Sequence, residues 1–156
     1  MLFAIDTSTL ILLQKLGWLS LCDEEAYDFI WPARVTQELK RQKSKNKAVL
    51  DLLNSGRAKE GTIQRSVEIK DISKTDAEVI SLAAENNATV ISEDVLLRKK
   101  AEKLKVSAIS LASFSALLYQ AGLSSKDEYL SRLKTLHEKT ALSKSEYHQY
   151  LQGLLP

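Results

Sequence analysis

The stretch that decides the fold is Ser73–Asp94, with the sequence SKTDAEVISLAAENNATVISED. Its apolar residues recur at helical spacing, and Asp76 lies near the start of the same face, so its first part predicts an amphipathic helix. The pair Asn86-Asn87 predicts a tight turn. The apolar run Ala88–Ser92 then predicts a central strand of a parallel sheet, which ends close to Asp94. Both acids therefore lie on inward-facing parts of neighbouring elements, and a buried carboxylate needs a compensating partner.

Outward from this stretch, the chain alternates between further apolar strands and helices. Strands are predicted at Leu2–Ile5, Phe29–Trp31 and Val106–Ile109, and Thr62–Ile69 is either a strand or an extended connection. Helices are predicted at Thr9–Leu16, at Glu24–Tyr27, from Pro32 through Leu39, at Ala48–Leu53, at Val95–Leu104 and at Leu111–Gln120. This alternation predicts an α/β fold, a three-layer sandwich with a central parallel sheet.

The C-terminal part predicts two amphipathic helices. Ser124 with Asp127, and Ser143 with Glu146, have the spacing of capping boxes at their starts. We therefore predict one domain over residues 1–122 and a two-helix extension over residues 123–156 that packs on the same domain.

Composition excludes several classes of protein. A chain of 156 residues with 44% hydrophobic and 27% charged residues is typical of one globular domain. The net charge of +2 is too small for a dedicated nucleic-acid binder, and a single cysteine, Cys22, excludes an internal disulfide and a cysteine-based zinc site. The sequence has no basic segment before an apolar N-terminal run and no apolar stretch long enough to cross a membrane, so we expect a cytoplasmic protein without a membrane partner.

Four acids are candidates for a shared site: Asp6, Glu38, Asp76 and Asp94. Asp6 and Asp94 follow predicted strands, and ligands of parallel sheets bind at the carboxyl ends of strands. Two carboxylates ~4 Å apart repel by about 4 kcal/mol, a large cost against a total stability of roughly 5–15 kcal/mol. A divalent cation would relieve this repulsion, and hard oxygen ligands without His or Cys favour Mg²⁺ or Mn²⁺.

Each of these acids also fits a purely structural role. Asp6 and Asp94 can cap the helices that follow them, and Asp76 can complete a capping box opened by Ser73. Glu38 can pair with an arginine one turn away, and the candidates are Arg34 and Arg41.

Three segments carry a resemblance to a known family: AIDTSTLI at Ala4–Ile11, ARVTQELK at Ala33–Lys40, and KTDAEVISLAAENNATVISEDVLLRKKAEKLKVSAIS at Lys74–Ser110. Together they resemble a PIN domain, the metal-dependent ribonuclease fold that includes the toxins of VapC-like toxin–antitoxin modules. The order and spacing of the motifs match over about the first 120 residues.

The resemblance implies that the four acids are the catalytic, metal-binding residues and that Mg²⁺ or Mn²⁺ is the cofactor. It implies that Ser8 or Thr7 supports Asp6. Glu93 stands where a small amide residue is more usual in the family, which makes it an additional acid of lower rank. The implied reaction is hydrolysis of single-stranded RNA to a 3′-hydroxyl and a 5′-phosphate. The implied partners are an antitoxin protein and a second copy of the chain in a homodimer.

Basic residues near the acids are candidates for contacts with the RNA backbone. They are Arg98 and Lys99, which follow Asp94, and Lys40, which follows Glu38 and begins the basic run KRQKSKNK. Such lysines also fit ordinary solvated helix faces.

Two other functions fit parts of the pattern. One is a phosphatase or phospho-acceptor with Asp6 as nucleophile, but haloacid-dehalogenase phosphatases need a second aspartate where this chain has Ser8. The other is a PIN-like module that binds RNA or protein without cleavage, against which the presence of all four acids argues. His137 and His148 lie in the C-terminal part, outside every motif, and are expected at the surface.

Overall fold

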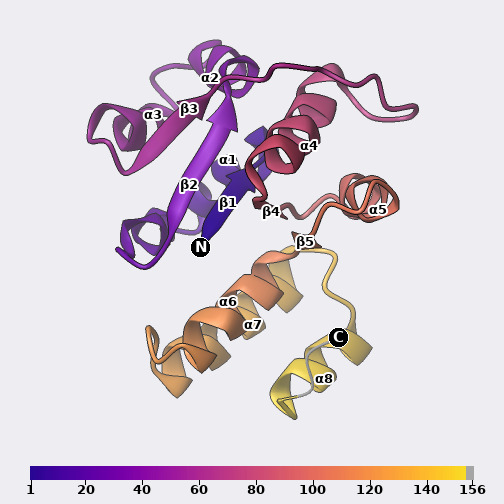
Figure 1. Cartoon of the computed structure of the whole chain (residues 1–156). Coiled ribbons are helices and arrows are strands. Elements are labelled where there is room, and N and C mark those ends of the chain that lie inside the picture. The colour runs from indigo at the N-terminus through magenta and orange to yellow at the C-terminus, as the bar shows by residue number, and fades with distance from the viewer. Residues whose placement is uncertain (154–156) are drawn as a thin grey trace. The chain divides into compact units, whose positions relative to one another are not determined.

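The computed structural model describes residues 1–153, which contain five strands, a short 3-10 helix and eight α-helices (Figure 1). In chain order they are β1 (Leu2–Ile5), α1 (Thr7–Lys15), η1 (Leu19–Asp23), β2 (Asp28–Pro32), α2 (Ala33–Lys40), α3 (Lys47–Asn54), β3 (Ala58–Gly61), α4 (Lys74–Asn86), β4 (Thr89–Ile91), α5 (Val95–Lys103), β5 (Ala108–Ile109), α6 (Leu111–Gln120), α7 (Lys126–Lys139) and α8 (Lys144–Leu151). The chain forms two compact units, Met1–Ala108 and Ile109–Pro156.

The strands form one sheet in the order β3-β2-β1-β4-β5. β1 pairs in parallel with both β2 and β4, and β2 pairs in parallel with β3. The inner strands are apolar on both faces because helices flank the sheet, and Phe3, Ala4 and Ile5 are completely buried. This architecture confirms the predicted α/β sandwich with a central parallel sheet.

The order of the strands reverses beside β1. From β1 the chain moves outward to β2 and β3, and α4 then leads back to β4 on the other side of β1. α4 packs against β1 and β2 within the first unit. Such a reversal is where open α/β sheets bind ligands, at the carboxyl ends of the two diverging strands.

The turn predicted at Asn86-Asn87 is confirmed. Asn87 has φ 52° and ψ 39°, and its N–H donates to the carbonyl of Ala83, which ends α4. Asparagine tolerates this left-handed conformation better than most residues, so the chain can reverse directly into β4.

One prediction of secondary structure is wrong, and one strand was not predicted. Glu24–Tyr27 is not a helix but a turn, closed by the Tyr27 N–H and the Glu24 carbonyl at 3.0 Å, and the helical turn nearby is η1, which buries Leu21 and Cys22. Thr62–Ile69, predicted as a strand or an extended connection, is a connection that contains no strand, and the unpredicted strand β3 lies just before it. β3 has the polar sequence AKEG of an exposed edge strand, so it lacks the apolar signal of the inner strands.

In the second unit, α6 packs against α7 and α7 against α8. The predicted capping box at Ser143 is confirmed, but the other is wrong by one residue. The Ser125 hydroxyl accepts the N–H of Glu128, and the Glu128 carboxylate accepts the N–H of Ser125, so α7 begins at Lys126. The predicted packing of residues 123–156 on a domain of residues 1–122 stays a prediction. No helix within residues 1–153 has the length and apolar character needed to span a membrane.

Candidate active site

Asp6 and Asp94 follow the two strands at which the sheet order reverses. Ile5 at the end of β1 pairs with Ile91 at the end of β4, so the residues after both strands leave the sheet at the same edge. The sequence places an acid immediately after β1 and another three residues after β4. The fold therefore puts two carboxylates at the position where this type of sheet binds ligands.

The carboxylate of Asp6 is almost completely buried, with 1% of the residue exposed. The Ser8 hydroxyl donates to its Oδ2 at 2.5 Å, whereas Oδ1 has no hydrogen-bond partner within the described residues. Burial raises the pKa of Asp6, and the nearby hydroxyls of Ser8, Thr9 and Ser92 oppose that rise. A buried acceptor that is left unpaired costs free energy, so Oδ1 marks this point as suited to a cation.

Thr9 and Ser92 connect Asp6 to the segment after β4. The Thr9 hydroxyl oxygen accepts the backbone N–H of Glu93 at 3.0 Å, and the Ser92 hydroxyl oxygen accepts that of Asp94 at 3.1 Å. Because both oxygens accept from the backbone, their O–H groups can donate to Asp6. The network fixes the turn that carries Glu93 and Asp94 against the end of β1.

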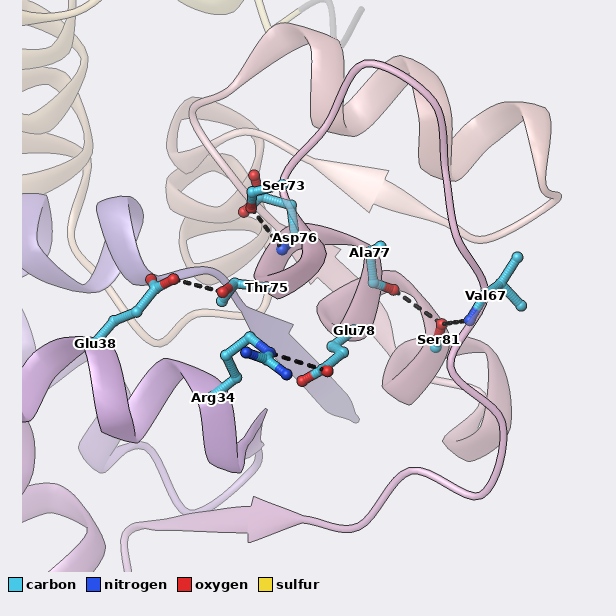
Figure 2. A network of polar contacts seen from close by, with 9 residues as sticks. All are labelled: Arg34, Glu38, Val67, Ser73, Thr75, Asp76, Ala77, Glu78 and Ser81. Atoms are coloured by element: carbon cyan, nitrogen blue, oxygen red, sulfur yellow. Dashed lines mark hydrogen bonds and ion pairs between the residues drawn. The ribbon is translucent and has the colours of Figure 1, made fainter.

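Glu38, on α2, is held by hydroxyl groups from two other helices. Thr7 of α1 donates to its Oε2 at 2.7 Å. Thr75 of α4 donates to its Oε1 at 2.5 Å, the hydrogen bond drawn in Figure 2. Thr7 thus supports Glu38, while Ser8 supports Asp6. The pairing of Glu38 with Arg34 that the sequence left open does not occur, because Arg34 forms an ion pair with Glu78 at 3.0 Å.

The carboxyl group of Asp76 is close enough to the other three acids to be affected by their charges. Asp76 is half-buried in the first turn of α4, where its N–H donates to the Ser73 hydroxyl at 3.0 Å. Burial raises the pKa of its carboxyl group most, the Ser73 hydroxyl lowers it, and the negative charges of Asp6, Asp94 and Glu38 raise it further. The structure therefore brings the four predicted acids close enough for their charges to act on one carboxyl group.

Asp94 is exposed and has a structural role as well. Its Oδ1 accepts the N–H groups of Leu96 and Leu97 at 2.7 and 3.1 Å, which caps α5. Glu93 is partly exposed, and its N–H donates to Thr9. Among the predicted RNA contacts, Arg98 donates from Nη1 to the Ser92 carbonyl at 2.5 Å, which puts a positive charge beside the end of β4. The other two, Lys99 and Lys40, have exposed side chains.

The donor set fits a hard divalent cation, although the side chains are not arranged as a complete metal site. Among residues 1–153, no three His, Cys, Asp or Glu side chains form a group ready to hold one ion. Two of the acids are instead engaged by hydrogen bonds, Glu38 with hydroxyls and Asp94 with backbone N–H groups. The unpaired Oδ1 of Asp6 and an all-oxygen set of donors nevertheless match the preferences of Mg²⁺ and Mn²⁺.

Sequence reasoning missed three hydroxyl residues of this cluster: Thr9, Thr75 and Ser92. Each lies next to an acid in the sequence or one helical turn from it. The sequence does not mark any of them as a partner, because a hydroxyl can be recognised as a partner only when its acceptor is known. Thr75 directly precedes Asp76, but its hydroxyl donates a hydrogen bond to Glu38, 37 residues away in the sequence.

Comparisons with known proteins agree with this geometry. The family model DUF3368, described as a PIN domain, matches residues 2–154. The structure is similar to that of a PilT N-terminus domain protein from the hyperthermophilic archaeon Sulfolobus solfataricus P2, with a TM-score of 0.50 and 20% sequence identity over 72% of this chain and 89% of that chain. None of the curated proteins compared with the chain matches it significantly.

Proposed function

Because the chain belongs to the PIN domain family, we propose that it is a metal-dependent endoribonuclease that hydrolyses phosphodiester bonds of single-stranded RNA. PIN domains are generally metal-dependent nucleases. The observation that carries the proposal is the convergence of four acids from different parts of the fold. The charges of Asp6, after β1, Glu38, on α2, and Asp94, before α5, all act on Asp76 of α4. None of the four acids has an ion-pair partner within residues 1–153, and a purely structural site would not gather four such charges.

Asp6, Glu38, Asp76 and Asp94 would hold Mg²⁺ or Mn²⁺. Such a cation supplies positive charge that activates a water and stabilises charge on the reacting phosphate. Thr7 and Thr75 orient Glu38 from both sides, and Ser8 orients Asp6. These hydroxyl partners keep the carboxylates in place in the absence of the metal.

Burial and the charges of the other three acids raise the pKa of Asp76 in the metal-free protein. A cation held by the four acids would offset this rise and keep Asp76 ionised. No side chain is required as a nucleophile. Arg98, Lys99 and Lys40 contribute positive charge for the RNA backbone around the acids.

The test is cleavage of a generic single-stranded RNA in the presence of Mn²⁺ or Mg²⁺, with analysis of the product ends. We expect 3′-hydroxyl and 5′-phosphate ends, and no cleavage after chelation with EDTA. Asp6→Asn and Asp76→Asn should each reduce the rate by at least about 100-fold, since even residues that only support metal ligands contribute about 10–100-fold.

The matched control is Glu102→Gln, which removes one exposed negative charge from α5 at a distance from the acids. This variant should cleave at the wild-type rate. Equal activity of the wild type and Asp76→Asn, purified in parallel, would identify a contaminating nuclease and overturn the proposal.

The finer role we propose is that of a cytoplasmic toxin that acts as a homodimer and is inhibited by an antitoxin protein. Two exposed apolar residues directly after Asp94, Val95 and Leu96, are 43% exposed each and offer a partner a contact next to the acids. Growth arrest on expression in bacteria should occur with the wild type and not with Asp6→Asn. Sedimentation of the purified chain as a monomer would exclude the homodimer.

A further inference from the structure

The loop between α2 and α3 concentrates positive charge on a chain that is almost neutral. The run Lys40–Lys47, here named the basic loop, comprises the last residue of α2, the connection and the first residue of α3. It contains five lysines and arginines but no acid, although the net charge of the whole chain is only +2. Its five cations are all exposed, namely Lys40, Arg41, Lys43, Lys45 and Lys47. Of these five, only Lys47 has an ion-pair partner within residues 1–153, namely Asp51 at 2.6 Å. Four cations of the loop are therefore available to a ligand.

Buried or partly buried amides hold the backbone of the basic loop in place. Gln14 of α1 donates from Nε2 to the Lys45 carbonyl at 2.5 Å, and its Oε1 accepts the N–H of Val49 at 3.2 Å. Asn46 is 5% exposed, and its Nδ2 donates to the Leu39 carbonyl at 3.0 Å. Gln14 thus bridges the loop and the start of α3, while Asn46 ties the loop to the end of α2.

From these observations we propose that the basic loop is a preformed binding surface for the phosphodiester backbone of single-stranded RNA, outside the acidic cluster. The inference rests on the proposed function, because it gives the substrate a second point of contact two residues after Glu38. Fixing the backbone in advance reduces the entropy that a charged loop would otherwise lose on binding.

The composition of the loop favours RNA over a protein partner. Between Leu39 and Ala48 there is no apolar or aromatic residue, whereas protein interfaces depend on apolar and aromatic residues in their buried centre. Without aromatic side chains the loop offers no aromatic platform for base stacking, so we expect it to contact mainly the backbone. The uncharged residues between the cations, Gln42 and Ser44, supply further hydrogen-bond donors for phosphate oxygens.

The test is binding of a fluorescein-labelled oligouridylate, followed by fluorescence anisotropy in EDTA over a series of KCl concentrations. The triple variant Arg41→Ala/Lys43→Ala/Lys45→Ala removes three cations from the loop. Single-stranded nucleic acids show a slope of log K against log salt of about −0.7 per neutralised phosphate. We therefore expect the triple variant to flatten this slope by about 2 and to raise Kd at least about tenfold at low salt.

A matched triple variant loses the same charge from exposed lysines of the second unit: Lys126→Ala, Lys134→Ala and Lys144→Ala. It should bind with the wild-type Kd and slope. If the wild type does not bind at the lowest salt, or if the loop variant keeps the wild-type slope, the inference is overturned. Tighter binding of polyglutamate than of RNA by the wild type would overturn the choice of RNA as the ligand.

EDTA prevents cleavage, so binding can be measured without catalysis. Failure of the binding surface and failure of the proposed nuclease function can therefore be distinguished. If the protein binds RNA through the loop but does not cleave it with Mn²⁺, the proposed nuclease function is rejected and the proposed binding surface is supported. If the protein cleaves RNA but the loop variant binds RNA like the wild type, the nuclease function is supported and the proposed binding surface is rejected.

Gln14→Ala tests the role of the anchor, because it retains every charge of the loop. We expect Kd to rise several-fold with the salt slope unchanged, since the same cations would then be held less firmly. Circular dichroism verifies that the variant is folded. An unchanged Kd would show that the loop needs no anchor and would remove preorganisation from the proposal.

Discussion

Replacing Asp6 by asparagine should stabilise the metal-free protein while it abolishes activity. The carboxylate is 1% exposed, its Oδ1 is unpaired, and its charge acts on Asp76 together with those of two other acids. Because burial raises the pKa of Asp6, the charged form is less favourable in the folded state than in the unfolded state. Asparagine has nearly the same shape and carries no charge, so it removes this cost at neutral pH.

The magnitude follows from the cost of the unpaired atom. A buried acceptor without a partner costs about 1–3 kcal/mol, and we expect a gain of that size in the free energy of unfolding at pH 7. The hydroxyls of Ser8, Thr9 and Ser92 around Asp6 can serve both the oxygen and the nitrogen of the new side chain. For a chain of this length each kcal/mol raises Tm by about 2–4 °C, so the increase should be about 2–12 °C.

Manganese should stabilise the wild type more than it stabilises Asp6→Asn. A ligand at 100 times its Kd stabilises the folded state by about 2.7 kcal/mol. The wild type should gain this amount on addition of Mn²⁺, while Asp6→Asn, which has lost one of the four acids, should gain much less. The difference in Tm seen in EDTA should therefore shrink or reverse in sign.

The assay is thermal unfolding followed by circular dichroism, in EDTA and in Mn²⁺, with Glu102→Gln as the control for loss of one exposed charge. The control should remain within about 0.5 kcal/mol of the wild type in both buffers. A variant Asp6→Asn that is less stable than the wild type in EDTA would show that the hydroxyl partners fully compensate the buried charge. Equal shifts of both proteins in Mn²⁺ would show that Asp6 does not contribute to cation binding.

Three further predictions concern the frame around the site. Glu85 accepts the N–H groups of Gln64 and Arg65, which lower the pKa of its carboxyl group. Its contribution to stability is therefore present above the ordinary pKa of 4.5 and is lost as the pH falls through the lower pKa of the folded state. In an NMR titration, Gln64→Pro should move the midpoint of Glu85 back toward 4.5. Gly61→Ala should cost about 1–3 kcal/mol in urea unfolding, because its Cβ would lie 2.6 Å from Cδ1 of the fully buried Leu82. Ser125→Ala should cost about 1 kcal/mol by the same method through loss of the α7 cap, and a loss no larger than that of Ser124→Ala would contradict the assignment of the cap.

The parts of the fold that the sequence predicts are those with a strong local signal. The inner strands β1, β2 and β4 are short apolar runs, because parallel strands are buried on both faces. α4 has both a capping serine at its start and Asn87 at its end, so both of its boundaries are encoded locally.

The failures occur where a distant part of the chain decides the local structure. The polar strand β3 exists because its backbone pairs with β2, and no side-chain pattern records that pairing. The segment after it is held along α4 by Glu85 and by the Ser81 hydroxyl, which accepts the N–H of Val67 at 3.3 Å. Side-chain acceptors on a helix therefore replace the strand pairing that β-branched residues had suggested.

The site shows why a structural and a functional interpretation of one residue need not exclude each other. Asp94 caps α5 through Oδ1, as the structural interpretation requires, and its negative charge also acts on Asp76. Within the described residues its Oδ2 takes no hydrogen bond, so one oxygen is committed to the fold while the other is available. A helix cap at the end of a strand fixes a carboxylate at the carboxyl edge of the sheet without using all of its acceptor capacity. An aspartate between a strand and a helix is therefore the sequence pattern of both a helix cap and a metal ligand. Only the approach of Glu38 and Asp76 from other helices distinguishes an ordinary cap from a member of a shared acidic site.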